Sequence, residues 1–400
     1  FVGWVHGGGN VFGMLGEMLA AGLNANLGGR DHAPIDVERQ VIRWVAELLG
    51  LPSTSSGLFV TGTSIANFMG VLTARVAAGG DQIRRAGVGS LRLVGYASVA
   101  AHESVARALD MAGLGSDALR RVPIDASHRM NIAALEEMVA RDRASGFQPF
   151  LVIGTAGTVD IGAIDDLSAM ADLCRRATLW LHVDGAFGAL GVLAPSIRPL
   201  LRGLERADSI ALDFHKWGQV PYDAGCFVAR DGDTLLRAFA TEAAYLRKEP
   251  RGLAAGAPWP VHLGPDLSRG FRALKVWFTL KSIGMDRLGR AIERTCELAR
   301  YLSERIDAEP ELERVAPVNL NIVCFRYLFP KDADQLHADL AADLQESGVA
   351  APSTTRIGGH LVLRMAIVNH RTRAADVDRC LEATLVLARS RVRRSPHSVG

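Results

Sequence analysis

Two apolar stretches that end abruptly in charged residues place the strongest constraint on how this chain can fold. One covers residues 179–183 and ends at Asp184, and the other covers residues 209–212 and is closely followed by Lys216. Short apolar runs bounded by polar residues indicate buried strands, and open α/β sheets bind ligands beyond the carboxyl ends of their strands. We therefore expect Asp184 and Lys216 to face the same crevice.

Similar apolar runs recur along the chain and alternate with segments of helical periodicity. Further strands are expected near 58–61, 91–96, 150–154 and 226–229, and helices near 11–24, 34–49, 64–78, 101–112, 132–140 and 166–177. Alternation of this kind indicates a mainly parallel sheet covered by helices. Beyond a helical region over 267–307, strands near 321–326 and 360–366 and helices near 333–347 and 374–388 predict a small α/β domain.

We therefore expect three parts in the chain. They are an N-terminal helical segment over 1–50, a large domain over 51–285 and a small C-terminal domain over 286–400. The net charge of the 400 residues is only +2, which argues against nucleic-acid and membrane-surface proteins. The five cysteines are scattered without a C-x-x-C pair, so neither a metal site nor a disulfide framework is expected, and a reducing compartment, the cytoplasm, is predicted.

A carboxylate and an amine in one dry crevice suit a particular cofactor. Taken alone, an Asp after a strand is often a turn residue and a Lys there is usually solvated. Here His215, Lys216 and Trp217 directly follow a buried strand, and Asp184 follows another, which favours a functional site. Pyridoxal phosphate needs a lysine for its Schiff base and an acid that keeps its pyridine nitrogen protonated.

The two motifs around these residues also resemble those of a known family. The strings His-Val-Asp-Gly-Ala at 182–186 and Asp-Phe-His-Lys-Trp at 213–217 resemble the pyridoxal-phosphate-dependent group II amino acid decarboxylases. That family contains aromatic-L-amino-acid, tyrosine and glutamate decarboxylases, and the resemblance extends over residues 1–388 or so. It implies fold type I (aspartate aminotransferase-like), decarboxylation of an L-amino acid to an amine, and a homodimer with shared active sites in which residues 1–50 lie at the interface.

The resemblance also implies roles for single residues. Lys216 would hold the cofactor covalently, Asp184 would pair with its ring nitrogen, and His102 would stack on the ring. A Thr-Gly-Thr-Ser turn at 61–64 opens a helix, where amide groups and the helix dipole favour a phosphate. The expected cofactor contacts are Thr63, Ser64, His102, Thr158, Asp184, Ala186, Asp213, His215 and Lys216, with Thr155 as the alternative to Thr158. The chain departs from the usual family pattern with Ile65, Val159 and Asp213 in place of Glu, Thr and Asn.

Residues 239–265 lose all periodicity and collect Gly, Pro and charge, as functional loops do. Tyr245 in this stretch resembles the loop tyrosine that returns a proton after carbon dioxide leaves, and it favours decarboxylation over aldehyde formation. Aldehyde synthase or lyase chemistry on the same scaffold and a non-catalytic cofactor-binding paralogue are the alternatives. The presence of Asp184, Lys216 and Tyr245 argues against the paralogue.

The first seven residues match the family segment that lines the substrate pocket. Trp4 and Val5 would form an apolar wall, and His6 replaces a common Pro. Asn26, with Asn24 beside it, would add a polar contact, and Arg364 matches a basic position of the small domain. These residues favour an aromatic substrate, although Trp4 is equally compatible with a place in the core. Family members carry a further helical segment before Phe1, so we expect the chain to lack its original N-terminus.

Overall fold

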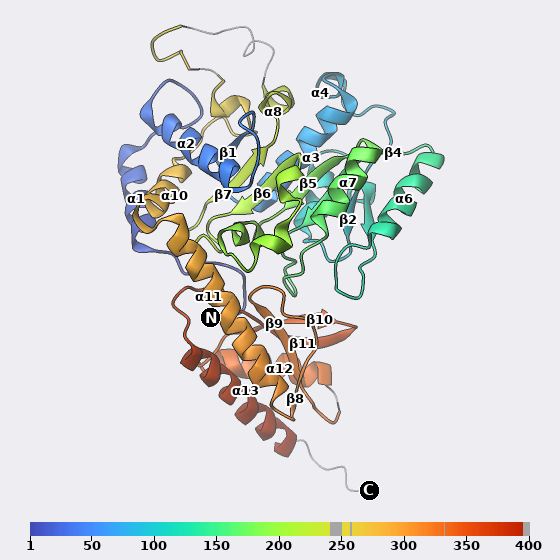
Figure 1. Ribbon diagram of the computed structural model, residues 1–400, viewed down its shortest axis with the longest axis vertical. Coiled ribbons are helices and arrows are strands. Elements are labelled where there is room, and N and C mark those ends of the chain that lie inside the picture. Colours follow the sequence, from blue (N-terminus) through green and yellow to red (C-terminus); the bar gives the residue numbers. More distant parts are fainter. Residues whose placement is uncertain (241–249, 257, 332, 395–400) are drawn as a thin grey trace.

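The computed structural model describes residues 1–240, 250–256, 258–331 and 333–394. Within them, a seven-stranded sheet lies at the centre of the larger part and a four-stranded sheet at the centre of the smaller part. Figure 1 shows the larger part above and the smaller part below, with one long helix passing between them. None of the helices in these ranges combines the length and apolar character that a membrane span requires.

The large sheet has the order β1-β7-β6-β5-β4-β2-β3 and is mainly parallel, as predicted. Its strands are β1 (Ser56–Val60), β2 (Leu93–Ser98), β3 (Leu119–Val122), β4 (Gln148–Thr155), β5 (Trp180–Asp184), β6 (Ser209–Asp213) and β7 (Gly225–Ala229). Only β7 runs against both of its neighbours, so β1 again has the direction of β6. The carboxyl ends of β1, β4, β5 and β6 therefore lie at one edge of the sheet.

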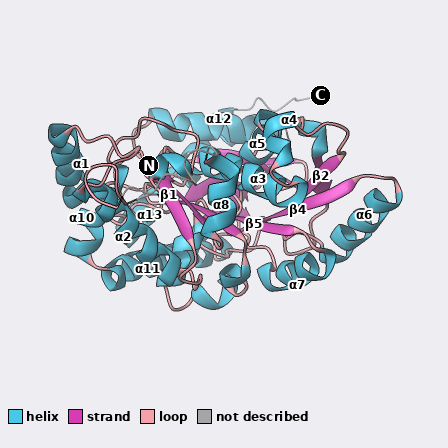
Figure 2. Cartoon of the chain, turned by 90° about the horizontal axis from the view of Figure 1, so that it is seen from above, coloured by secondary structure: helices cyan, strands magenta, loops and turns pink. Residues whose placement is uncertain are grey.

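Helices cover both faces of this sheet, which Figure 2 shows as a layer between them. The helices of the larger part are α1 (Val11–Leu23), α2 (Ala33–Leu48), α3 (Thr63–Gly79), α4 (Gln82–Ala86), α5 (Ser104–Met111), α6 (Ile132–Ala144), α7 (Leu167–Ala177), α8 (Gly232–Phe239) and α10 (Arg272–Ile283). Strands β5, β6 and β7 are almost entirely buried, as strands between two helical layers must be. Among the helices, α3 packs directly on β5, β6 and β7.

The helical region expected over 267–307 is in fact two helices. Gly284 separates α10 from α11 (Met285–Asp307) and has a φ of +82°, a backbone conformation that side-chain-bearing residues rarely adopt. Leu288 and Ile292 of α11 belong to the core of the large sheet, whereas Leu302 and Ile306 belong to the core of the small sheet. The domain boundary near residue 286 remains a prediction, and α11 begins there and connects both cores.

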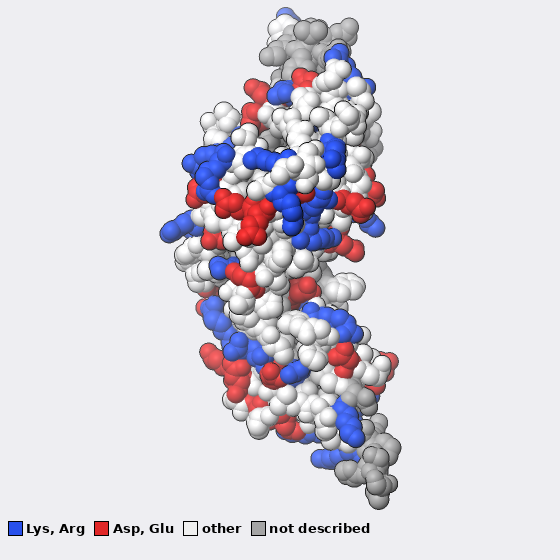
Figure 3. Space-filling view, turned by 90° about the vertical axis from the view of Figure 1, so that its right-hand side faces the viewer, with Lys and Arg blue, Asp and Glu red and all other residues white. Residues whose placement is uncertain are grey.

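The small sheet is antiparallel and has the order β10-β11-β9-β8. Its elements are β8 (Leu312–Arg314), β9 (Ile322–Tyr327), β10 (Ser353–Ile357), β11 (His360–Ala366), α12 (Ala333–Glu346) and α13 (Ala374–Arg394). The N-terminal residues join this part, because Val2 donates a backbone hydrogen bond to Ala351 and accepts one from Ala366. On the face shown in Figure 3, basic and acidic side chains are interspersed, in keeping with the nearly balanced net charge.

Candidate active site

A cavity of about 520 Å³ opens at the edge where the parallel strands end. Eleven predicted site residues line it, namely Trp4, Val5, His6, Thr63, Ser64, His102, Asp184, Ala186, Asp213, His215 and Lys216. They come from the N-terminal segment, the start of α3, the loop before α5, and the ends of β5 and β6. The parallel strand order brings these distant segments of the sequence together.

The amine of Lys216 is held at the end of β6 by a carboxylate. Its Nζ lies 3.1 Å from Oδ2 of Asp213, and the Lys216 side chain is 22% exposed. Oδ1 of Asp213 accepts a hydrogen bond of 2.9 Å from the backbone N–H of Thr63. Asp213 therefore links the lysine to the first residue of α3.

His215 lies beside Asp213 as a neutral ring. Its Nδ1 accepts a hydrogen bond of 3.0 Å from the N–H of Ala224, so its proton sits on Nε2, which lies 3.6 Å from Oδ2 of Asp213. Burial lowers the pKa of His215 below its ordinary value, which supports the neutral form. Tyr222 stacks on this ring with the two centroids 4.0 Å apart.

Asp184 ends β5 and is buried, with only 5% of its surface exposed. Its Oδ2 accepts a hydrogen bond of 2.9 Å from Nδ2 of Asn67, and its Oδ1 accepts one of 3.1 Å from the N–H of Ala186. Both donors are neutral, so they satisfy the oxygens without neutralising the charge. A protonated pyridine nitrogen would supply the missing cation.

His102 lies just outside α5, which begins at Ser104 rather than at the expected position 101. Its Nδ1 accepts a hydrogen bond of 3.2 Å from the N–H of Ser104 and lies 2.9 Å from the Ser104 hydroxyl. The ring is exposed and lines the cavity, as a group that stacks on a planar cofactor must do. Its stacking role stays a prediction.

Two buried hydroxyls test whether the cavity fits pyridoxal phosphate. Oγ1 of Thr63 and Oγ1 of Thr155 have no hydrogen-bond partner among the described residues, although both residues line the cavity. A buried hydroxyl without a partner costs about 1–3 kcal/mol, so these groups are suited to receive a polar ligand. Phosphate oxygens at the start of α3 and a polar ring substituent near Thr155 would satisfy them. The residues present therefore fit this cofactor.

Two predicted residues stand apart from the cavity lining, and a third cannot be placed because it lies outside the described residues. The hydroxyl of Thr158 accepts a hydrogen bond from Ala163, so Thr155 is the better placed of the two alternatives. Oδ1 of Asn26 accepts hydrogen bonds from the N–H groups of Gly28 and Arg269, which fixes its own loop. The third, Tyr245, lies outside the described residues. The roles of all three stay predictions.

Arg364 reaches the cavity from β11, but its guanidinium is already engaged. It donates to the carbonyls of Val159, Asp160 and Gly3 and to the hydroxyl of Ser353. These bonds join the small sheet, the turn after β4 and the N-terminal segment. Arg364 therefore fixes the wall of the cavity.

Tyr222 is a cavity residue that the sequence interpretation missed. It lines the cavity and stacks on His215, six positions after Lys216 in the chain. The available signal was an aromatic residue close behind the Lys216 motif, in a segment that returns toward β7. Asn67, which holds Asp184, was also missed, because its position inside α3 gives no indication of what it touches.

A mainly parallel seven-stranded sheet, with a lysine, a buried carboxylate and unpaired hydroxyls at the ends of its strands, fits the pyridoxal-phosphate enzymes of fold type I. The model of the family described as "Pyridoxal-dependent decarboxylase conserved domain" matches residues 3–328. The chain belongs to this family. It is accordingly a carboxy-lyase that uses pyridoxal phosphate, and the group II decarboxylase resemblance is confirmed.

Curated relatives and solved structures agree on the family and differ in substrate. An aromatic-L-amino-acid decarboxylase of Bacillus atrophaeus is 33% identical over 94% of this chain and 78% of its own length. An L-2,4-diaminobutyrate decarboxylase of Rhizobium meliloti is 34% identical over 92% of this chain and 73% of its own. The structure of Oryza sativa TDC with PLP and tryptamine has a TM-score of 0.87 at 26% identity and covers 96% of this chain and 82% of that one.

Proposed function

We propose that the enzyme decarboxylates an L-amino acid with an aromatic side chain to the corresponding amine and carbon dioxide. When bound, the cofactor supplies an electron sink for the bond that breaks at Cα. Lys216 would bind the cofactor, Asp184 would hold its ring nitrogen protonated, and His102 would cover the ring. Tyr245 would return the proton, a role predicted from the resemblance.

One observation carries the choice of an aromatic substrate. Rings from the N-terminal segment and from the loop after Lys216 form a continuous series, and all of them except Phe1 line the cavity. The centroid distances are 5.5 Å for Phe1–Trp4, 6.0 Å for Trp4–His6, 6.4 Å for His6–Tyr222 and 4.0 Å for Tyr222–His215. Aromatic pairs at such distances attract one another beyond their apolar burial, so this wall favours a planar aromatic side chain.

A diaminobutyrate-like substrate would need a negative group near the end of its side chain. Among the described residues that line the cavity, the acidic ones are Asp184 and Asp213. Asp213 pairs with Lys216, and Asp184 is assigned to the ring nitrogen, so both belong to the cofactor end. A substrate ammonium group facing Trp4 and Val5 would lose its hydration without gaining a counter-charge.

The test of this proposal is a substrate panel. The purified enzyme, loaded with pyridoxal phosphate, is incubated with tryptophan, tyrosine, phenylalanine, 2,4-diaminobutyrate, glutamate and histidine, and the amines are identified by mass spectrometry. We expect aromatic amines, and we expect Trp4→Ala to lower kcat/KM for the aromatic substrates. Preferential release of the diaminobutyrate product would contradict the proposal. Aldehyde in place of amine would favour the aldehyde synthase alternative.

We also propose that the enzyme is a homodimer with shared sites. Helix α1 exposes seven apolar side chains, Val11, Phe12, Met14, Leu15, Met18, Leu19 and Leu23, each at least 38% exposed. The opposite side of α1 packs closely on α10, where a Cβ on Gly16 would come within 2.8 Å of Cα of Lys275. An exposed apolar face of this extent is typical of a protein interface.

A second copy is the proposed occupant of the α1 face because the start of α1 is bound to the loop that follows Lys216. Asn10, which caps α1, donates to the carbonyl of Gln219 in the loop after Lys216. Sedimentation should show a dimer that Met18→Asp dissociates, whereas the similarly exposed Val386→Asp on α13 leaves it intact. A monomeric wild type would refute the proposal.

All five cysteines are free and buried, which supports the predicted reducing compartment, the cytoplasm.

A further inference from the structure

Three polar residues alternate along β5 and therefore lie on one face of the sheet. Side chains two positions apart in a strand point the same way, so Trp180, His182 and Asp184 all face α3. His182 is completely buried. Buried polar groups are costly unless they are hydrogen-bonded, so the partners of these three side chains need to be identified.

A continuous line of hydrogen bonds joins the three residues. The indole N–H of Trp180 lies 2.9 Å from Oγ of Ser209, which lies 2.8 Å from Nδ1 of His182. Nε2 of His182 lies 3.0 Å from Oδ1 of Asn67, and Nδ2 of Asn67 lies 2.9 Å from Oδ2 of Asp184. Ser209 pairs with His182 across β6 and β5, and Asn67 reaches in from α3.

The two ends of this line fix the direction in which every bond donates. An ionised carboxylate only accepts, so the amide of Asn67 presents its N–H to Asp184 and its oxygen to His182. His182 therefore donates from Nε2, and because burial lowers its pKa and keeps the ring neutral, its Nδ1 accepts from the hydroxyl of Ser209. The Ser209 oxygen is left to accept from Trp180, whose indole only donates. All four bonds therefore donate toward Asp184.

A branch from Asn67 reaches His102. Nδ2 of Asn67 also lies 3.2 Å from Oγ of Ser104, and this oxygen lies 2.9 Å from Nδ1 of His102. Because that Nδ1 also accepts from the backbone of Ser104, the hydroxyl donates to it. The side-chain amide of Asn67, which is fully buried in α3, therefore contacts Asp184, and the Ser104 hydroxyl connects it to His102.

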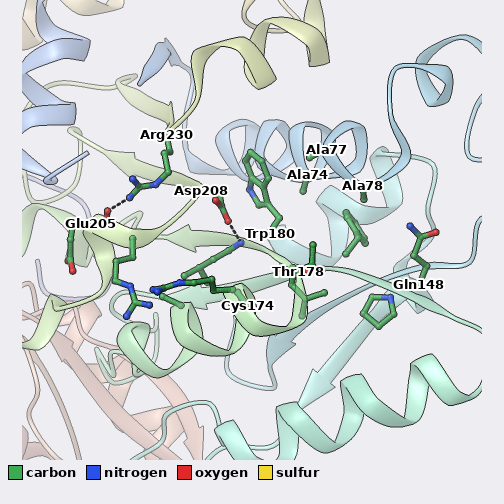
Figure 4. Close-up of a pocket in the computed structure, with 17 residues that line it drawn as sticks. Ala74, Ala77, Ala78, Gln148, Cys174, Thr178, Trp180, Glu205, Asp208 and Arg230 are labelled. Carbon is green, nitrogen blue, oxygen red and sulfur yellow. Dashed lines mark hydrogen bonds between the residues drawn. The ribbon is translucent and has the colours of Figure 1, made fainter. Parts of the chain in front are cut away.

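Helix α3 is shaped to accommodate this line. A Cβ on Gly70 would meet Nδ1 of His182 at 2.6 Å, so a glycine is required where the imidazole packs against the helix. At the far end, Trp180 lines a groove of about 720 Å³ beyond the amino ends of β5 and β6. Figure 4 shows it beside Ala74, Ala77 and Ala78 of α3. The line therefore runs along one face of the sheet, from this groove at the amino ends of the strands to the active-site edge.

We propose that Asn67 and His182 are positioning residues that orient Asp184 and His102 for the cofactor. The line keeps Oδ2 of Asp184 fixed by a donor that is itself held by His182, and it adds no charge that would compete with the ring nitrogen. The inference rests on the proposed role of Asp184. The effect of a substitution on Asp184 should decrease with distance along the line, so Asn67 should matter most, His182 less and Trp180 least.

The experiment compares variants along the line with a control on the same helix. Asn67→Asp exchanges the donor for an oxygen and puts two carboxylates in contact, which forces them to share a proton. His182→Leu removes both ring bonds, His182→Gln can restore them, and Trp180→Phe removes only the outer donor. Thr73→Val is the control, because Thr73 is fully buried in α3 and bonds only to the carbonyl of Met69 among the described residues.

Two readouts separate positioning from stability: the Kd of pyridoxal phosphate for the cofactor-free protein, and the absorbance of the bound cofactor as a function of pH. We expect Asn67→Asp to raise the Kd roughly 10- to 100-fold and to change the pH dependence of the absorbance, since a hydrogen bond to a charged group has about this effect. His182→Leu should follow in the same direction, His182→Gln should recover most of the loss, and Thr73→Val should lower only Tm.

The outcomes distinguish failure of the inference from failure of its premise. Wild-type Kd and absorbance in Asn67→Asp, together with their loss in Asp184→Ala, would overturn the positioning role and leave the role of Asp184 intact. Wild-type behaviour of Asp184→Ala would refute the premise itself. If Asn67→Asp does not fold, His182→Leu against His182→Gln gives the same comparison, and equal Kd values in that pair would overturn the inference.

Discussion

Acidification should destabilise the protein through His182. Burial lowers the pKa of His182 from 6.5 to about 4, against the opposing charge of Asp184. Above about pH 6.5 the residue is neutral in both states and contributes nothing to the pH dependence of unfolding. As the pH falls toward 4, the unfolded chain takes up a proton that the folded chain refuses, so stability declines. Below both pKa values the decline stops.

The size of this effect follows from the two pKa values. The difference between 6.5 and about 4, at about 1.4 kcal/mol for each pH unit, corresponds to about 3 kcal/mol of unfolding free energy. The pKa of His215 and that of His337 are also lowered by burial, so acid destabilisation of the wild type alone would not identify its source. A variant that removes only the His182 titration is needed.

His182→Gln provides that comparison, because its amide can make similar hydrogen bonds and does not titrate. Urea unfolding of both cofactor-free proteins, at the same protein concentration, is followed by fluorescence at about pH 7.5 and about pH 4.5. When the pH is lowered from about 7.5 to about 4.5, the free energy of unfolding of the variant should rise by about 2–3 kcal/mol relative to that of the wild type. The contributions of the other histidines are the same in both proteins and cancel in the difference. An equal difference at both pH values would show that His182 is not neutral and buried, and would refute the donor direction assigned to the line.

The remaining predictions concern the chemistry. Borohydride reduction followed by mass spectrometry should place the cofactor on Lys216, and attachment to another lysine would contradict the assignment. Asp184→Ala should lose most of kcat with little change in Tm, whereas near-normal turnover would argue against its electrostatic role. In the presence of oxygen, Tyr245→Phe should still release carbon dioxide but form less amine and more aldehyde, ammonia and hydrogen peroxide, with oxygen as the two-electron oxidant. An unchanged amine yield would count against a proton donor at this position. Mixing Tyr245→Phe with Lys216→Ala subunits should restore about a quarter of the sites if these are shared in random dimers, and no restoration would exclude sharing.

The placement of Asp184 and Lys216 was predictable because it follows from strand pattern alone. Apolar runs before each residue identify buried parallel strands, and parallel neighbours end at one edge. Strand β3 was not predictable in this way, because its Leu-Arg-Arg-Val sequence is too polar at its centre to show an apolar run. Its position at the edge of the sheet, where fewer side chains are covered, explains that composition.

The line of hydrogen bonds behind Asp184 was only partly predictable from the sequence. The alternation of Trp180, His182 and Asp184 is visible in the sequence, and it indicates that the three share a face. Their partners cannot be read from the sequence, because Asn67 is more than a hundred positions away and its rotation about α3 depends on the packing of the whole layer. The contact with Tyr222 escapes prediction for the same reason, since it depends on how the loop after Lys216 folds back.

The two carboxylates of the cavity show how the chain assigns different tasks to the same chemical group. Asp213 has a cation 3.1 Å away in Lys216, so its charge is already compensated within the chain. Asp184 is just as buried, but its bonds come from an amide and a backbone N–H, and the histidine behind that amide is held neutral by burial. A buried carboxylate left without a cation is destabilising unless a ligand supplies one. The folded chain therefore retains at Asp184 an electrostatic deficit that a protonated cofactor ring would relieve, and a cation in place of Asn67 would remove that preference by satisfying Asp184 in advance.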